Sequence, residues 1–144
     1  MSRAPLLGRA AYPAWERLDL RWDDADRYGH VNNAVHYRWF DTAVNGWLIG
    51  RGLLDVASGD PIGLVVETGC RYAASLTYPE PAEVGLGVGE VGRSSVRFLL
   101  GVFAAGAERA AAEGFFVHVY VGRGDRRPVP VPDAWRAALA ELAA

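Results

Sequence analysis

The chain of 144 residues contains no lysine, one cysteine and three histidines. All 15 basic residues are therefore arginines, which we attribute mainly to genome composition and only weakly to phosphate binding. A lone cysteine excludes an internal disulfide, and Cys70 lies in an apolar, strand-like run that favours a buried structural thiol. His36 and His118 lack a cysteine or carboxylate partner at metal-binding spacing, so we predict no metal site.

The sequence also lacks a strong charge of one sign and a long apolar run. Its formal net charge is −2, which gives no reason to expect nucleic acid or an acidic membrane as a partner. Residues 1–12 lack a cationic stretch followed by a sustained apolar one, so no signal peptide is predicted. No run is long and charge-free enough to span a bilayer. We therefore expect a single domain over residues 1–144, soluble and cytoplasmic by default.

One segment is apolar over most of a helical circumference. The predicted helix covers residues 33–49, and Asn32 or Asn33 is its cap because an asparagine side chain accepts from the orphan N–H groups of a first turn. Its polar residues form one narrow stripe, consisting of Arg38, Asp41 or Thr42, and Asn45. A helix with so wide an apolar surface must be wrapped by other structure.

Strand-like segments supply the wrapping material. Alternating or β-branched patterns cover residues 15–22, 62–78, 84–92, 96–105 and 115–121. Short links between the strands after the helix predict an antiparallel meander. A short helix is expected from near Pro132, and residues 1–13 are expected to form a loose leader. Because no βαβ alternation is present, we predict an α+β protein with one sheet around one central helix.

Polar chemistry is concentrated between the first strand and the helix, in residues 22–40. Asp26 lies in a turn just before the predicted helix, whose start carries unpaired N–H groups and the positive end of the helix dipole. A carboxylate beside such groups suits attack on an acyl group. The alternative interpretation of Asp26 is a solvated turn acid. We interpret Asp23 and Asp24 as turn and capping residues.

Two further features of this stretch have both a chemical and a structural interpretation. His30 follows Asp26 by four positions, close enough to orient a substrate or share a proton, although a lone histidine is more often structural. The backbone N–H groups of Asn33 and Ala34 are candidate oxyanion donors. By contrast, the G-x-G-x-x-G string at Gly87–Gly92 precedes a strand-like segment, so we do not interpret it as a dinucleotide site.

A resemblance to a known family rests on three runs: Asp24-Ala25-Asp26, Gly29-His30-Val31-Asn32-Asn33 and Tyr37-Arg38-Trp39-Phe40-Asp41. They resemble the hot-dog-fold acyl-CoA thioesterases, in particular the 4-hydroxybenzoyl-CoA thioesterase-like group. The likeness extends over roughly residues 15–142 and includes an Arg-Pro exit after the last strand. It implies the hot-dog fold, in which an antiparallel sheet of about five strands wraps one long central helix and a short C-terminal helix follows.

The resemblance also implies roles for particular residues. Asp26 matches the family's catalytic carboxylate, and the helix-start N–H of Asn33 matches its oxyanion donor. The run from Asp26 to Asn33 is also similar to plant acyl-carrier-protein thioesterases, which have an asparagine and a histidine after the aspartate. His30 matches that histidine, whereas Tyr28 stands in place of the asparagine. Glu67 falls near the second acid of those enzymes.

Candidate substrate contacts complete the predicted site. Tyr28 and Gly29 border the catalytic turn, and Tyr37, with Trp39 and Trp47, is a candidate lining of an acyl pocket. Coenzyme A carries phosphates, for which arginine is the natural partner. The candidates are Arg93 at a strand turn and, after the last strand, Arg123, Arg126 and Arg127.

The expected activity is hydrolysis of an acyl-CoA or acyl-carrier-protein thioester, with Asp26 as general base or nucleophile. No cofactor is expected, because a thioester is already activated. The resemblance implies a homodimer with active sites between protomers, or a homotetramer. Two other functions stay open: a hydratase or dehydratase on the same fold, and a non-catalytic module that binds acyl thioesters.

Overall fold

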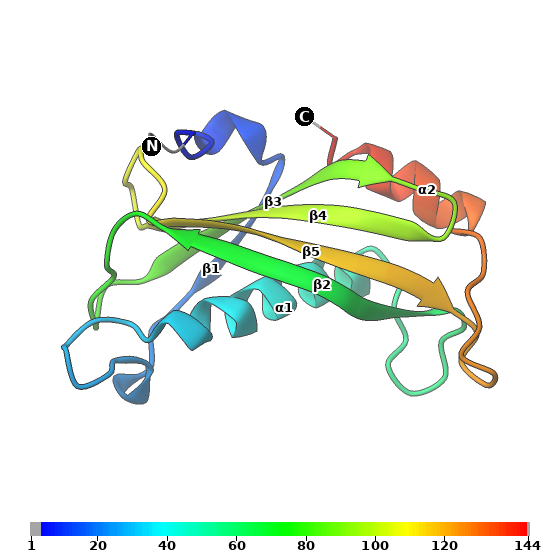
Figure 1. Cartoon of the computed structure of the whole chain (residues 1–144), viewed down its shortest axis with the longest axis horizontal. Helices are drawn as coiled ribbons and strands as arrows, with labels where there is room; N and C mark the ends of the chain where they lie inside the picture. Colours follow the sequence, from blue (N-terminus) through cyan, green and yellow to red (C-terminus); the bar gives the residue numbers. More distant parts are fainter. Residues whose placement is uncertain (1–3, 144) are drawn as a thin grey trace.

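The computed structural model describes residues 4–143 as one curved sheet around a long helix (Figure 1). The elements in chain order are η1 (Arg9–Ala11), β1 (Ala14–Leu18), η2 (Trp22–Asp24), α1 (Asn33–Gly50), β2 (Ile62–Tyr72), β3 (Ala82–Val91), β4 (Ser95–Ala104), β5 (Ala112–Val121) and α2 (Asp133–Ala140). The strands are antiparallel and lie in the order β1-β3-β4-β5-β2. This architecture confirms the predicted fold class. No helix within the described part is long and apolar enough to cross a membrane.

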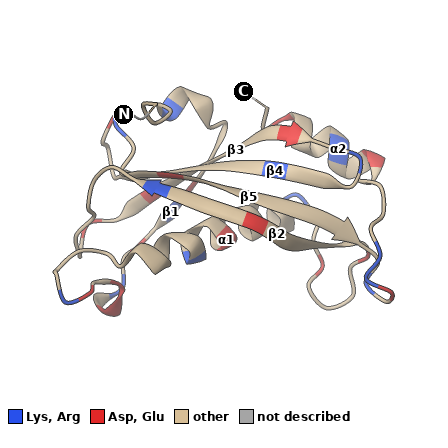
Figure 2. Cartoon of the chain, in the orientation of Figure 1, with Lys and Arg blue, Asp and Glu red and all other residues tan. Residues whose placement is uncertain are grey.

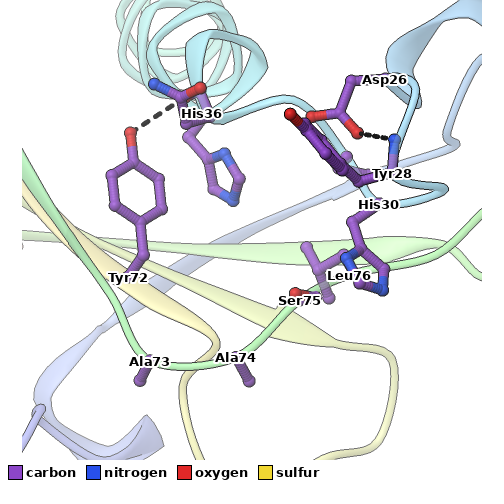
Figure 3. A pocket seen from close by; sticks show the side chains of 11 residues that line it. Asp26, Tyr28, His30, His36, Tyr72, Ala73, Ala74, Ser75 and Leu76 are labelled. Atoms are coloured by element: carbon purple, nitrogen blue, oxygen red, sulfur yellow. Dashed lines mark hydrogen bonds between the residues drawn. The ribbon is translucent and has the colours of Figure 1, made fainter.

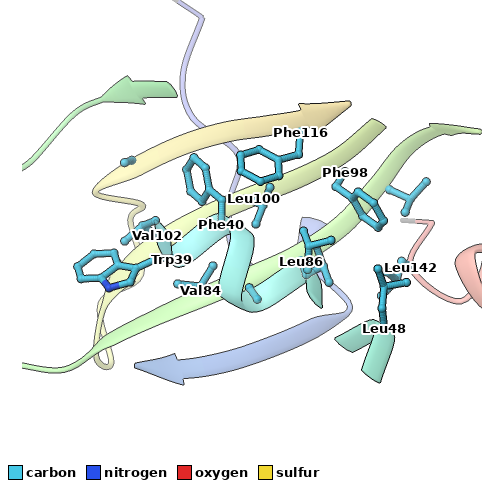
Figure 4. Packing of buried hydrophobic residues seen from close by; sticks show 14 of the residues in the cluster. Trp39, Phe40, Leu48, Val84, Leu86, Phe98, Leu100, Val102, Phe116 and Leu142 are labelled. Atoms are coloured by element: carbon cyan, nitrogen blue, oxygen red, sulfur yellow. The ribbon is translucent and has the colours of Figure 1, made fainter. Parts of the chain in front are cut away.

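Helix α1 begins and packs as its sequence predicts. The side chain of Asn32 accepts a hydrogen bond from the N–H of Ala34, which makes Asn32 the cap. Figure 4 shows the apolar face of α1 enclosed by the sheet, and the residues concerned are Trp39, Phe40, Ala43, Val44 and Leu48. Burial of a single large apolar side chain contributes about 2–3 kcal/mol, so this face holds the helix in the sheet.

The inner face of the sheet supplies the other half of the core. Alternate residues of β3, β4 and β5 point toward α1, including Leu86, Phe98, Leu100 and Phe116 (Figure 4). Phe116 meets Phe40 of the helix edge to face, with ring centroids 5.9 Å apart. The period-2 alternation of the strands therefore produced a continuous apolar layer, as expected for a half-buried antiparallel sheet.

The predicted meander is wrong for β2. Strands β3, β4 and β5 follow one another as neighbours, but β2 pairs with β5 instead of β3. The free edge of β3 is taken by β1, through pairs from Ala14 with Leu86 to Leu18 with Ala82. The prediction assumed that strands joined by a short link are neighbours in the sheet. Residues 73–81 instead lead the chain from β2, at one edge of the sheet, across to β3.

Two predicted strands end earlier than their sequence patterns. The first stops at Leu18, and Trp22 lies in the 3-10 turn η2 with 81% of its surface exposed. That turn forms because the carboxylate of Asp24 accepts a hydrogen bond from the N–H of Arg21. The second stops at Tyr72, after which Ala73 and Ala74 both donate to the carbonyl of Ala111 and turn the chain away.

The predicted loose leader is wrong for residues 4–13, while residues 1–3 lie outside the described part. Tyr12 is buried on the outer face of the sheet, opposite α1. Its ring fits there because Gly85 and Gly101 have no side chains: an added Cβ would lie 2.7 and 2.6 Å from ring or Cβ atoms of Tyr12. Arg9 forms an ion pair of 2.8 Å with Glu83, which fastens the segment to β3.

The glycine-rich string Gly87–Gly92 belongs to strand β3 and its turn into β4. Strand β4 follows it, as the sequence pattern predicted, whereas a dinucleotide-binding motif requires a helix at this place. Gly87 serves close packing instead, because an added Cβ would lie 3.1 Å from the carbonyl oxygen of Ala11.

Candidate active site

The loop between η2 and α1 is closed by its own hydrogen bonds. The N–H of Asp26 donates to the carbonyl of His30, and the N–H of Asn32 donates to the carbonyl of Asp24. Each of these hydrogen bonds is 2.9 Å long. Gly29 makes the reversal with a φ of +79°, a conformation that favours glycine. The chain thus returns on itself, and both Asp26 and the start of α1 are held at one end of the sheet.

Asp24 supports this loop from inside the protein. Its side chain is buried, accepts from the N–H of Arg21 at 2.7 Å and forms an ion pair of 2.6 Å with Arg38 on α1. A buried carboxylate needs such partners to offset its loss of hydration. The interpretation of Asp24 as a capping residue is confirmed. Its negative charge serves to pair with Arg38 and so stabilises the fold.

Asp26 lies at the rim of a cavity of about 420 Å³ (Figure 3). Its Oδ1 accepts a hydrogen bond of 2.9 Å from the N–H of Tyr28, two residues later. This turn-type contact restricts the orientation of the carboxylate beside the cavity that Asp26 lines. Asp26 is itself partly exposed, so its carboxylate is reachable by a small molecule.

The start of α1 contributes one unpaired donor to the same cavity. Of the two predicted oxyanion donors, Ala34 is excluded, because its N–H is bonded to the Asn32 side chain at 2.9 Å. Within residues 4–143 the N–H of Asn33 has no hydrogen-bond partner, and Asn33 lines the cavity. The positive end of the helix dipole acts at this point and favours a developing negative charge.

The opposite wall comes from the end of β2 and the link after it. Tyr72, Ala73, Ala74, Ser75 and Leu76 line the cavity there. Two contacts hold this wall to the loop before α1 and to the start of α1. The Tyr72 hydroxyl donates to the carbonyl of Asn33, and the N–H of Val31 donates to the carbonyl of Leu76, each with a distance of 2.9 Å. The cavity therefore lies between two segments that are distant in sequence, residues 26–36 and residues 72–76.

His36 is a cavity residue that the sequence interpretation missed. It is only 3% exposed, and neither of its ring nitrogens has a hydrogen-bond partner in the part of the chain that the structure describes. Burial lowers the pKa of His36, and the nearby carbonyl groups of Asn32 and Asn33 act in the opposite direction without reaching hydrogen-bond geometry. Its spacing of three and four residues from that pair was the available signal.

The predicted site residues divide into two groups. Asp26, Tyr28, His30 and Asn33 line the 420 Å³ cavity together, and Gly29 lines a neighbouring cavity of about 330 Å³ with Asp26. Other candidates line neither cavity: Tyr37, Glu67, Arg93 and Arg126. Tyr37 packs against the core beside Phe40, and Glu67 is an exposed residue of β2.

The candidate phosphate-binding arginines lie at the other end of the sheet. Figure 2 shows the basic loop after β5 far from the loop that precedes α1. The 11-residue strand β2 runs from Ile62, beside Val121, to Tyr72 at the cavity, which corresponds to roughly 35 Å. Arg126 and Arg93 are exposed there, whereas Arg123 donates to the carbonyls of Val56 and Gly59 and braces a loop.

No group of three or more histidine, cysteine, aspartate or glutamate side chains suited to a metal ion occurs within residues 4–143. The polar residues that line the cavity include one carboxylate, Asp26, two imidazoles, His30 and His36, and Asn33, whose backbone N–H is a donor. These are the components of acid–base and oxyanion chemistry.

A comparison with family models decides the affiliation. Residues 20–139 match the model of the thioesterase-like superfamily, and the match covers the loop between η2 and α1, all of α1 and strands β2 to β5. This chain belongs to the thioesterase-like superfamily. No protein of curated function matches it.

Solved structures agree with this assignment to the thioesterase-like superfamily. The chain is 47% identical to the PA5185 protein of Pseudomonas aeruginosa strain PAO1, with a TM-score of 0.92 over 95% of this chain and 96% of that one. It is 30% identical to a thioesterase of Thermus thermophilus solved with coenzyme A and zinc, with a TM-score of 0.77 over 92% of this chain and 95% of that one.

A more distant structure supports the fold alone. The 1,4-dihydroxy-2-naphthoyl-CoA thioesterase of Synechocystis is 18% identical, with a TM-score of 0.80 over 89% of this chain and 96% of that chain. The five-stranded sheet around α1 is therefore the hot-dog fold of thioesterases, as the sequence resemblance implied.

Proposed function

We propose that this protein is an acyl-CoA thioesterase that hydrolyses an acyl-CoA, or an acyl-carrier-protein thioester, to the free acid and thiol. The observation that carries the proposal is that Asp26 and Asn33 line the same cavity. Asp26 brings a carboxylate, and Asn33 brings a backbone N–H that has no hydrogen-bond partner within residues 4–143. Membership of the thioesterase-like superfamily supports the same reaction class.

In the proposed mechanism the thioester carbonyl lies against the start of α1. The Asn33 N–H donates to the oxygen that becomes negative in the tetrahedral intermediate, and one such donor commonly contributes about 3 kcal/mol. Asp26 either takes a proton from the attacking water or attacks the carbonyl itself to form a mixed anhydride. Both routes expel the thiolate, which is protonated on leaving, and in the second route water then hydrolyses the anhydride to the free acid and restores the Asp26 carboxylate.

His30 has a supporting role in this proposal. It follows the glycine reversal and lines the same cavity as Asp26. A histidine at this place can orient the thioester or supply the proton that the leaving thiolate takes up. No cofactor is required, since the thioester is an activated acyl group and hydrolysis needs only water.

A second copy of the chain is proposed to complete the site. Strand β2 lies at the sheet edge and exposes three adjacent apolar residues, Leu64, Val65 and Val66. Such an edge is a template for pairing with another strand. Antiparallel pairing of two β2 strands about their midpoint would place Tyr72 beside Ile62 of the partner subunit, and thus bring the partner's basic loop, with Arg126, to the cavity.

This arrangement suits coenzyme A, whose phosphates require cations that the cavity of one protomer does not contain among its described residues. The Thermus thermophilus relative was solved with coenzyme A. Replacing Val66 by lysine would repel the edges and shift the dimer toward monomer, which analytical ultracentrifugation measures. A monomer with full activity would contradict a shared site.

The function itself is tested by thiol release from acyl-CoA substrates of short, medium, long and aryl type. We expect Asp26→Asn to lower kcat by at least about 100-fold. Asp23→Asn is the matched control, because Asp23 is exposed and lines neither cavity. Saturated acyl-CoA excludes a hydratase, which has no double bond to act on.

Two results would contradict hydrolysis at this site. One is a folded Asp26→Asn protein that releases thiol as fast as the wild type. The other is tight binding of acyl-CoA by the wild type without turnover of any substrate, which would favour a binding module.

A further inference from the structure

Two buried histidines, His36 and His118, have ring nitrogens without hydrogen-bond partners among residues 4–143. Most buried polar groups in native proteins are hydrogen-bonded, so each unsatisfied one requires an explanation. The two differ in their surroundings. His118 packs against Phe98 and Phe116 and lines none of the cavities near Asp26, whereas His36 lines the 420 Å³ cavity.

The ring of His36 is held in place by aromatic neighbours. It meets Tyr72 edge to face, with ring centroids 5.0 Å apart at 88°, and Trp39 at 5.3 Å. Figure 3 shows the imidazole projecting from α1 into the space between Tyr72 and Tyr28. These aromatic neighbours restrict rotation of the ring, whose two nitrogens are buried at the wall of the cavity.

His36 also lies close to where the thioester carbonyl is proposed to bind. It follows Asn33 by three residues, a rise of about 4.5 Å along the helix. Side chains of a helix lean toward its N-terminus, so the ring covers the first turn, in agreement with its nearness to the carbonyls of Asn32 and Asn33. A group bonded to His36 is therefore close to the thioester carbon.

Burial lowers the pKa of His36 and therefore favours the neutral imidazole. A neutral imidazole has one N–H donor and one acceptor nitrogen. A hydroxyl group can pair with either nitrogen, since it both donates and accepts. A plain hydrocarbon chain can pair with neither and leaves the imidazole unsatisfied.

We propose that His36 is a specificity-determining residue that hydrogen-bonds a hydroxyl group on the third carbon of the acyl chain, so that 3-hydroxyacyl thioesters are the preferred substrate class. This inference rests on the proposed thioesterase function. It adds to that function a residue outside the catalytic loop and a polar feature of the acyl group.

The first test compares 3-hydroxybutanoyl-CoA, as each enantiomer, with butanoyl-CoA by thiol release from the wild-type protein. We expect kcat/KM for the better enantiomer to exceed that for butanoyl-CoA by about 10-fold to 100-fold, because the analogue without a hydroxyl leaves a buried polar group unpaired. A ratio near one overturns the inference and leaves thioester hydrolysis intact.

The second test assigns the preference to one side chain. In His36→Phe, which keeps an aromatic ring between Tyr72 and Trp39, the ratio should fall to within about threefold of one. His118→Phe is the matched control and should keep the wild-type ratio, since His118 is buried elsewhere. His36→Gln retains a hydrogen-bonding group and should keep part of the ratio. An unchanged ratio in folded His36→Phe overturns the inference.

A binding measurement separates this inference from the proposed function. Analogues of both substrates with a methylene group inserted between sulfur and carbonyl cannot be hydrolysed, and calorimetry gives their Kd. If the wild type hydrolyses neither thioester, the proposed hydrolysis is wrong. A Kd that is tenfold lower for the hydroxylated analogue, with this difference lost in His36→Phe, would still support the proposed role of His36 in binding the hydroxyl group. Equal Kd values for the two analogues overturn it.

Discussion

The hydroxyl of Tyr72 donates a hydrogen bond of 2.9 Å to the main-chain carbonyl of Asn33 and thereby joins the last residue of β2 to the first residue of α1. The same tyrosine ring contacts His36, one turn along the helix. One side chain thus sets the distance between the sheet wall of the cavity and the helix start that carries the candidate oxyanion donor.

Removal of this hydroxyl in Tyr72→Phe should affect activity more than stability. A half-exposed hydrogen bond contributes about 1 kcal/mol, so the free energy of unfolding should fall by about that amount in a urea titration. A helix start that is free to shift relative to β2 misplaces the donor, and we expect kcat/KM for thiol release to fall about tenfold. An unchanged kcat/KM would show that the bond does not position the site.

Asp24→Asn should destabilise the protein through the loop between η2 and α1. The substitution keeps the shape but removes the charge that pairs with Arg38, a cation that is itself partly exposed. We expect a loss of about 2 kcal/mol in the free energy of unfolding. Asp23→Asn, at the exposed neighbouring position, should change it by less than about 0.5 kcal/mol. Equal losses in the two variants would be inconsistent with a structural role specific to Asp24.

Gly114→Ala should disturb the packing between β5 and α1. An added Cβ would clash with a ring carbon of Phe40 and would lie 2.6 Å from the carbonyl oxygen of Gly69, which is backbone and cannot move aside. Overpacking of this kind costs about 1–3 kcal/mol, which thermal or urea unfolding measures. Gly124→Ala is the control, since nothing lies within 4 Å of its added Cβ. A neutral Gly114→Ala would mean that the sheet yields readily at this point.

His118 should make stability fall in acid. Burial lowers its pKa from the ordinary 6.5 to about 4, and Asp41 acts in the opposite direction. Between these values the unfolded chain binds a proton that the folded chain does not, so the free energy of unfolding decreases as pH falls from 6.5 toward 4. The loss from this group reaches about 3 kcal/mol at the lower end.

The test is urea unfolding of wild type and His118→Phe at several pH values. The phenylalanine cannot bind a proton, so the variant should lose less stability than the wild type over this window. Parallel curves for the two proteins would show that His118 is not the source of the acid sensitivity.

The loop that carries Asp26 could be interpreted from the sequence because most of its contacts are local. Asp26, His30 and Asn33 lie within eight residues, and the hydrogen bonds that bring them together join positions four to eight apart. The identity of the unpaired donor needed the structure, since either Asn32 or Asn33 was an acceptable cap. Only the observed bond from Ala34 to the Asn32 side chain leaves Asn33 as the donor.

Residues that reach the cavity from elsewhere were not predictable in the same way. Tyr72 and Leu76 join the site through contacts with Asn33 and Val31, about 40 residues earlier in the chain. The sequence pattern extended β2 through this region to residue 78, since nothing local marks Tyr72 as its end. Arg126 and Arg93 were assigned to the site from the sequence because arginines bind phosphates. Within one protomer, however, they lie about the length of β2 away from the cavity.

Sequence alone determined the helix, most of the strand positions and the chemistry of the Asp26 loop, because burial on one face imposes repeats of 3.6 and 2 residues and because short turns depend on their own residues. Tertiary structure decided that β2 lies at the sheet edge beside β5 and that Tyr72 meets the start of α1. Which strands pair depends on competition among segments that are far apart in the chain. That competition leaves no pattern in the local sequence. The polar loop therefore became a lined cavity only through the fold.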